Sequence, residues 1–372
     1  MLVPAMLAPD RREHYYAIDF GRGLAALAIL LWHYQHFFFP LAGVPMTIPM
    51  ERQPLYEVFG FFYRHGLEAV QFFWLISGFI FMAVYDGRVS VKTADFAINR
   101  LARLYPLHLL TLVVIAILQI VSTRMVGHEQ IYADNTPTQF ALNVFFASHW
   151  LPKSLSSFNG PIWSVSVEVL VYAGFWLARP ALLRTGIVGP ARIASGAWAL
   201  RKAGVSDDAR ILECVQYFFA GSTILVLSRR YVRSAVGLGV LAAITLVAAN
   251  VSLILRPWNR EFLGLPLVLV GLMLAMCAVE ATTHGRRFKA LQWVGDNTYG
   301  TYLWHVPIQI AVLIFLDAVV GSREVALSPW FLAAFIVAVV TVARLSFIYF
   351  EGPARRWVRR LEVQPQRQLA RT

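Results

Sequence analysis

The apolar run DFGRGLAALAILLWHYQHFFFP, residues 19–40, predicts a membrane-spanning helix, because a crossing needs about 20 predominantly apolar residues. The same run contains Arg22 and His33. An arginine at the centre of a membrane helix costs roughly 2.5–3.5 kcal/mol even on lenient insertion scales, so ionisable side chains inside a span indicate a functional site. The run therefore predicts both the fold class and the first candidate site residues.

The composition of the chain agrees with this interpretation. Its 372 residues are 58% hydrophobic and 14% aromatic but only 15% charged, which excludes an ordinary soluble protein and indicates a polytopic membrane protein. The net charge of +12 comes from arginines in short clusters between apolar runs, as in cytoplasmic loops, so we expect no nucleic-acid binding. Cys214 and Cys277 each lie inside an apolar run and predict neither a disulfide framework nor a metal site.

Nine segments are apolar enough to predict membrane spans from hydropathy alone. They are 17–39, 68–85, 104–122, 163–179, 211–228, 232–255, 262–281, 298–318 and 329–350. If Arg11 and Arg12 are cytoplasmic, nine crossings place three basic clusters outside, against the positive-inside rule. These clusters are RRYVR (229–233), HGRRFK (284–289) and GPARRWVRR (352–360).

A tenth crossing removes this conflict, and the polar segment 180–200 is the place for it. We therefore expect an all-α bundle of about ten transmembrane helices with both termini cytoplasmic and a weak fifth span buried among its neighbours. Residues 1–360 are predicted to form a single transmembrane domain, followed by a basic cytoplasmic tail at 361–372.

Arg22 and His33 are eleven residues apart in the first span. Eleven residues of α-helix make three turns plus about 20°, so both side chains lie on one face, roughly 16 Å apart along the axis. The structural alternatives are an interface arginine paired with Asp19 and a histidine that bridges two helices through a hydrogen bond. The shared face favours a single groove that both side chains enter.

The segment INRLARLYPLH, residues 98–108, stands at the predicted cytoplasmic start of the third span. Arg100 and Arg103 are three residues apart and therefore share a helix face, which makes a pair suited to phosphate. A simple positive-inside cluster that only sets topology is an equally weighted alternative for this segment alone.

Two further segments carry polar groups into the predicted bundle. In NGPIWSVSVEVLVY, residues 159–172, Glu168 lies about two turns into a span, where a carboxylate needs a partner or a proton. In WVGDNTYGTYLWHVPI, residues 293–308, Tyr299, Tyr302 and His305 recur every three residues on one broad face. The tyrosines also fit an interfacial aromatic belt, whereas His305 lies deeper in the span.

Seven pieces of the chain, in this order, resemble the membrane acyltransferase-3 family, whose members O-acylate carbohydrates and other acceptors with acyl-CoA. They are Arg22-x10-His33, FFWLISGFIF (72–81), Arg100-x-x-Arg103, PIWSVSVEVLVY (161–172), RILECVQYFFAGS (210–222), TYGTYLWHVPI (298–308) and YFEGPARR (349–356). The resemblance covers nearly the whole chain, and it also implies about ten spans in a bacterial inner membrane.

The resemblance and the helical geometry together suggest a mechanism. Acyl-CoA, most simply acetyl-CoA, is expected to bind from the cytoplasm with its phosphates against Arg100, Arg103 and Arg22, and its thin pantetheine arm then reaches along the first span to His33. His33 is expected to act as general base on an acceptor hydroxyl or to carry the acyl group itself. Glu168 and His305 are candidate orienting or acceptor-binding groups for a surface or lipid-linked carbohydrate, and no metal is expected.

A proton-coupled transporter or flippase of a glycan or small molecule is the competing class of protein. Intramembrane Arg, His and Glu residues also build proton pathways, and ten spans suit a transporter. The chain shows no internal sequence repeat, however, and a transporter does not require the pair Arg100 and Arg103 at the cytoplasmic side.

Overall fold

The computed structural model describes residues 15–41, 44–86, 91–151, 154–255, 263–283 and 286–360. The predicted basic tail at 361–372, as well as Arg11 and Arg12, lie outside the described residues.

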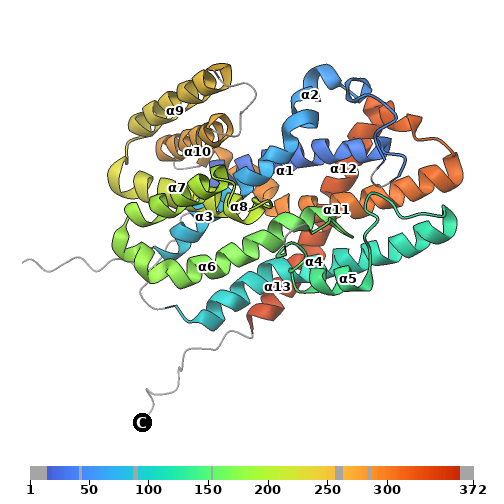
Figure 1. Ribbon diagram of the computed structural model, residues 1–372, viewed down its shortest axis with the longest axis horizontal. Helices are drawn as coiled ribbons and strands as arrows, with labels where there is room; N and C mark the ends of the chain where they lie inside the picture. The colour runs from blue at the N-terminus through green and yellow to red at the C-terminus, as the bar shows by residue number, and fades with distance from the viewer. Residues whose placement is uncertain are drawn as a thin grey trace, which may run out of the picture.

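The described part of the chain is helical throughout and contains no strand (Figure 1). The α-helices are α1 (Tyr16–His33), α2 (Tyr56–His65), α3 (Ala69–Tyr85), α4 (Thr93–Met125), α5 (Pro137–Val144), α6 (Trp163–Thr185), α7 (Val188–Lys202), α8 (Arg210–Val226), α9 (Ala235–Leu255), α10 (Gly264–Thr283), α11 (Gln292–Phe315), α12 (Pro329–Ser346) and α13 (Gly352–Arg359). Figure 1 shows α9 and α10 packed side by side at one end of the bundle.

Eight helical stretches within the described residues are long and apolar enough to cross a membrane. They are Tyr56–Tyr85, Thr93–Met125, Gly160–Thr185, Arg210–Tyr231, Ala235–Leu255, Gly264–Thr282, Phe288–Val320 and Pro329–Arg359. The prediction of an all-α, multi-pass integral membrane protein is therefore confirmed. The remaining two predicted crossings correspond to α1 and α7, so the count of ten and the side of each terminus stay predictions.

The first predicted span, 17–39, forms the central helix of the bundle. Ten of the 18 residues of α1 are buried, and α1 contacts α2, α3, α10 and α11. Small residues such as Gly21 and Ala25 allow these neighbours to approach closely. The α-helix ends at His33, and the chain continues as the 3-10 helix η1 (Tyr34–Phe38).

The expectation for segment 180–200 is wrong in two respects. The helix of the preceding span, α6, continues through Pro180 to Thr185, and it ends at Gly186, whose φ of 58° favours glycine. The new helix α7 then has only 15 residues, of which Pro190 and Ala197 are buried. It packs beside α6 and α8 at the periphery and is not buried among its neighbours.

A fusion experiment decides whether α7 crosses the membrane. We expect a reporter fused at residue 206, after α7, to be external and one fused at residue 288, before α11, to be cytoplasmic, because ten crossings place the basic cluster at 284–289 inside. An external reporter at 288 would rule out the ten-span topology.

Helices α3 and α8 cross at two glycines. A Cβ atom added at Gly78 would lie 1.7 Å from the Phe218 carbonyl oxygen, and one added at Gly221 would lie 1.8 Å from that of Leu75. Ser222 Oγ donates a 3.0 Å hydrogen bond to the Gly78 carbonyl across the same crossing. The backbones therefore touch without intervening side chains, as in small-residue membrane interfaces.

Gly78→Leu is expected to lower the melting temperature of the purified protein, because overpacking a tight interface costs about 1–3 kcal/mol. Gly174→Leu on α6 is the matched control, since a Cβ atom there meets nothing within 4 Å. Equal melting temperatures for the two variants would contradict a close α3–α8 crossing.

Candidate functional site

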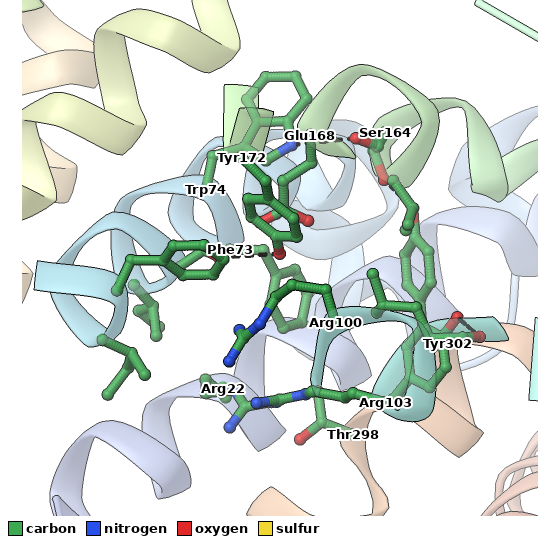
Figure 2. Close-up of a pocket in the computed structure, with 17 residues that line it drawn as sticks. Arg22, Phe73, Trp74, Arg100, Arg103, Ser164, Glu168, Tyr172, Thr298 and Tyr302 are labelled. Carbon is green, nitrogen blue, oxygen red and sulfur yellow. Dashed lines mark hydrogen bonds between the residues drawn. The ribbon is translucent and has the colours of Figure 1, made fainter. Parts of the chain in front are cut away.

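A cavity of about 110 Å³ lies between α1, α3, α4, α6 and α11. Arginine, serine, threonine, tyrosine and glutamate side chains line it together with apolar residues (Figure 2). These polar residues are Arg22, Ser77, Arg100, Arg103, Ser164, Glu168, Tyr172, Thr298, Tyr299 and Tyr302. We refer to it below as the arginine cavity.

The structure brings the three predicted phosphate-binding arginines together in this cavity. Arg22 comes from α1, whereas Arg100 and Arg103 come from the first half of α4. Figure 2 shows the guanidinium groups of Arg22 and Arg103 next to each other, with that of Arg100 close to them. Helix α4 begins at Thr93, well before the predicted span at 104, and this extension presents the pair on an ordered helix.

The arginines that line the cavity outnumber its acidic side chains. Arg22 forms a 3.0 Å ion pair with Asp19, so the structural alternative for Arg22 holds alongside its position in the cavity. The Arg100 guanidinium lies 4.5 Å from the centroid of the Phe81 ring, and its Nε is buried without a hydrogen-bond partner among the described residues. Glu168 is the one acidic side chain among the described residues that line the cavity, so the cavity is rich in positive charge.

Glu168 lies with the arginines and not with the histidines. Its carboxylate has Ser77 and Tyr172 as hydrogen-bond partners and interacts electrostatically with Arg100 and Arg103. The Ser77 and Tyr172 hydroxyl oxygens are themselves 3.2 Å apart. This position suits a group that orients the arginines, and Glu168 lines the cavity whereas His305, the other candidate orienting group, does not.

The two predicted histidines meet in a second cluster. His33 is the last residue of α1 and His305 lies in the middle of α11, and their ring centroids are 4.7 Å apart. Both side chains are buried. A third ring, His36 in η1, lies 5.2 Å from His33. We refer to His33, His36 and His305 as the histidine cluster.

Hydrogen bonds set the tautomer of two of these rings. His33 Nδ1 donates to the Ile29 carbonyl at 2.9 Å, and His305 Nδ1 donates to the Thr301 carbonyl at 3.2 Å. Because a carbonyl oxygen only accepts, Nδ1 carries the proton and Nε2 keeps its lone pair in each neutral ring. His305 Nε2 is buried without a hydrogen-bond partner among the described residues. The cluster can therefore accept protons at Nε2.

Tyr302 connects the two groups of residues. It lines the arginine cavity, and its ring centroid lies 6.1 Å from that of His305. Its hydroxyl donates to the Pro161 carbonyl at 2.6 Å and is 2.8 Å from Ser164 Oγ. His33 does not line the cavity itself, but the cluster that contains it adjoins the wall of the cavity.

Sequence reasoning missed His36 and Gln309. Gln309 Nε2 donates a 3.0 Å hydrogen bond to the His33 carbonyl and so ties α11 to the end of α1. The three-residue spacing of His33 and His36 was a usable signal, because residues three apart lie on one face of either an α-helix or a 3-10 helix. Within the described residues no group of at least three His, Cys, Asp or Glu side chains could hold a metal ion.

Two comparisons relate the chain to known proteins. The family described as acyltransferase domain, acyltransferase-3, matches residues 15–347. The chain is similar to the peptidoglycan O-acetyltransferase OatA of Listeria monocytogenes serovar 1/2a, with 22% identity over 390 residues. This match covers 93% of the chain but 56% of the relative, so the chain spans about half the length of that curated protein. No solved structure matches the chain.

Proposed function

The chain belongs to the acyltransferase-3 family, and on this basis we propose that it is a membrane O-acyltransferase. In this proposal it moves an acyl group, most simply acetyl, from cytoplasmic acyl-CoA to a hydroxyl of a cell-surface or lipid-linked carbohydrate. The name of the relative, a peptidoglycan O-acetyltransferase, supports both the acetyl group and the carbohydrate acceptor. The observation that carries the proposal is the convergence of Arg22, Arg100 and Arg103 on a cavity that adjoins the histidine cluster.

The donor binds through its phosphates. Guanidinium groups form charge-assisted, often bidentate hydrogen bonds to phosphate, and three of them face this cavity. In this arrangement the nucleotide stays at the mouth of the cavity, and the narrow acyl-pantetheine arm covers the roughly 16 Å of helix between Arg22 and His33.

The histidine cluster supplies the base. Nε2 of His33 takes the proton of the acceptor hydroxyl while the acceptor oxygen bonds to the thioester carbonyl carbon. The carbon–sulfur bond then breaks, and the departing CoA thiolate receives the proton from the His33 imidazolium. His305, whose ring lies 4.7 Å from His33, orients the acceptor or the base.

A titration tests donor binding and separates this proposal from a transporter. The purified protein in lipid nanodiscs is expected to bind acetyl-CoA saturably, and free CoA is expected to displace it. A transporter or flippase of glycans gives no reason for such binding. A protein that folds, as judged by its melting transition, and yet does not bind acetyl-CoA would contradict the proposed function.

A further inference from the structure

Arg179 on α6 is a buried cation that has no anionic partner within the described parts of the chain. Its residue exposure is 8%, and its Nε and Nη2 atoms have no hydrogen-bond partner among the described residues. Its guanidinium lies 5.3 Å from the centroid of the Trp176 ring. The ring is attractive to a cation, but it carries no negative charge to balance the arginine.

Two other arginines with largely buried side chains have acidic partners. Arg201 pairs with Glu213, and Arg323 pairs with Asp317 at 2.5 Å. Removing a cation from water without such a partner is strongly unfavourable, so an unpaired buried arginine indicates that a bound ligand supplies the anion. A guanidinium group matches the oxygens of a phosphate in particular.

A continuous set of ring contacts joins Arg179 to the arginine cavity. Trp176 stacks on Phe96 with ring centroids 4.4 Å apart, and Phe96 lies 6.1 Å from Phe81. Phe81 lines the cavity and carries Arg100 over its face. Trp176 Nε1 also donates a 3.1 Å hydrogen bond to Thr93, the first residue of α4. Arg179 therefore lies at the same end of α4 as Arg100 and Arg103.

We propose that Arg179 forms a second phosphate subsite, which binds the ribose 3′-phosphate of the acyl-CoA donor. This inference rests on the proposed function. CoA carries phosphate in two places, a diphosphate that leads to the pantetheine arm and a monoester on the ribose. The three arginines of the cavity bind the diphosphate, and Arg179, beyond the aromatic contacts, binds the monoester. A phospholipid headgroup offers the same phosphate chemistry, and the experiment distinguishes the two sources.

The test compares CoA with dephospho-CoA, which lacks only the 3′-phosphate. Dissociation constants of both are measured for the unchanged protein, Arg179→Gln and Arg184→Gln. We expect the unchanged protein to prefer CoA by about 10- to 100-fold, the effect of losing hydrogen bonds to a charged group. Arg179→Gln should abolish that preference without changing the affinity for dephospho-CoA. Arg184 is the matched control, because it is an exposed arginine on the same helix.

Three results would overturn the subsite. The first is equal affinity of the unchanged protein for CoA and dephospho-CoA. The second is an Arg179→Gln variant that still prefers CoA. The third is an Arg179→Gln variant whose affinity for both ligands falls by the same factor. If native mass spectrometry showed that Arg179→Gln loses a bound phospholipid while the preference for CoA stays, the anion would be a headgroup. If Arg179→Gln does not fold, the same two dissociation constants are measured for Arg179→Lys and compared with those of the unchanged protein, and a preference for CoA that stays the same would overturn the subsite. A folded, unchanged protein that binds neither ligand would instead contradict the proposed function itself.

Discussion

Replacement of His33 by glutamine is expected to lower the rate of acyl transfer by about 10²- to 10⁴-fold, the usual loss when a general base is removed. Glutamine keeps the approximate size and some hydrogen bonding, but it cannot take a hydroxyl proton at neutral pH. The affinity for acetyl-CoA should persist, because Arg22, a proposed phosphate-binding residue, lies eleven residues before His33. Transfer rate, acetyl-CoA affinity and melting temperature are measured on the same purified variant.

His108→Gln is the matched control for this experiment. His108 is also a buried histidine in a helix, and its Nε2 donates a 2.8 Å hydrogen bond to the Asn143 carbonyl, which is a structural role. We expect His108→Gln to lower the melting temperature and to change transfer only modestly. If His33→Gln behaved in the same way, His33 would be a helix-bridging residue and His305 would become the candidate base.

The double variant Arg100→Ala/Arg103→Ala is expected to weaken acetyl-CoA binding by about 10- to 100-fold for each guanidinium–phosphate hydrogen bond that it removes. Because the two residues are neighbours, their effects need not add in full. The measurement is a titration of acetyl-CoA into the purified variant, accompanied by its melting temperature. Because Glu168 interacts electrostatically with both side chains, the melting temperature shows whether the variant keeps its fold when it loses affinity.

Arg192→Ala on α7 serves as the control, since Arg192 is exposed and lies outside the cavity. It should bind acetyl-CoA like the unchanged protein. An unchanged affinity in the double variant would mean that Arg100 and Arg103 only set the topology of the chain.

Periodicity and spacing predicted much of the candidate site. The helical repeat correctly placed Arg100 and Arg103 on one face, and Arg22, which was expected to join them, lines the same cavity. His33 at the end of α1 lies beside His305 in the middle of α11, although the two residues are far apart in the chain. The pattern of each span marked them as candidates, whereas only the packing of the spans brings them together.

Other features depend on local backbone changes that a uniform helical repeat does not describe. The α-helix ends at His33 and continues as a 3-10 helix, in which Tyr34 is fully buried. Helix α6 continues to Thr185, beyond the expected end of that span at residue 179, and Gly186 then ends it. Glu168 faces the arginines because α6 packs beside α3 and α4 at Ser77 and Arg100, and its position in one span does not reveal those neighbours.

The central claim, that the chain O-acylates a carbohydrate, is tested most directly by mass spectrometry of surface glycans from three strains. One strain carries the unchanged gene, one lacks it, and one carries His33→Gln at the same locus with normal amounts of the protein. We predict that base-labile acyl esters on one class of glycan are present in the first strain and lost in the other two. Identical acyl esters in all three strains would contradict the proposed function.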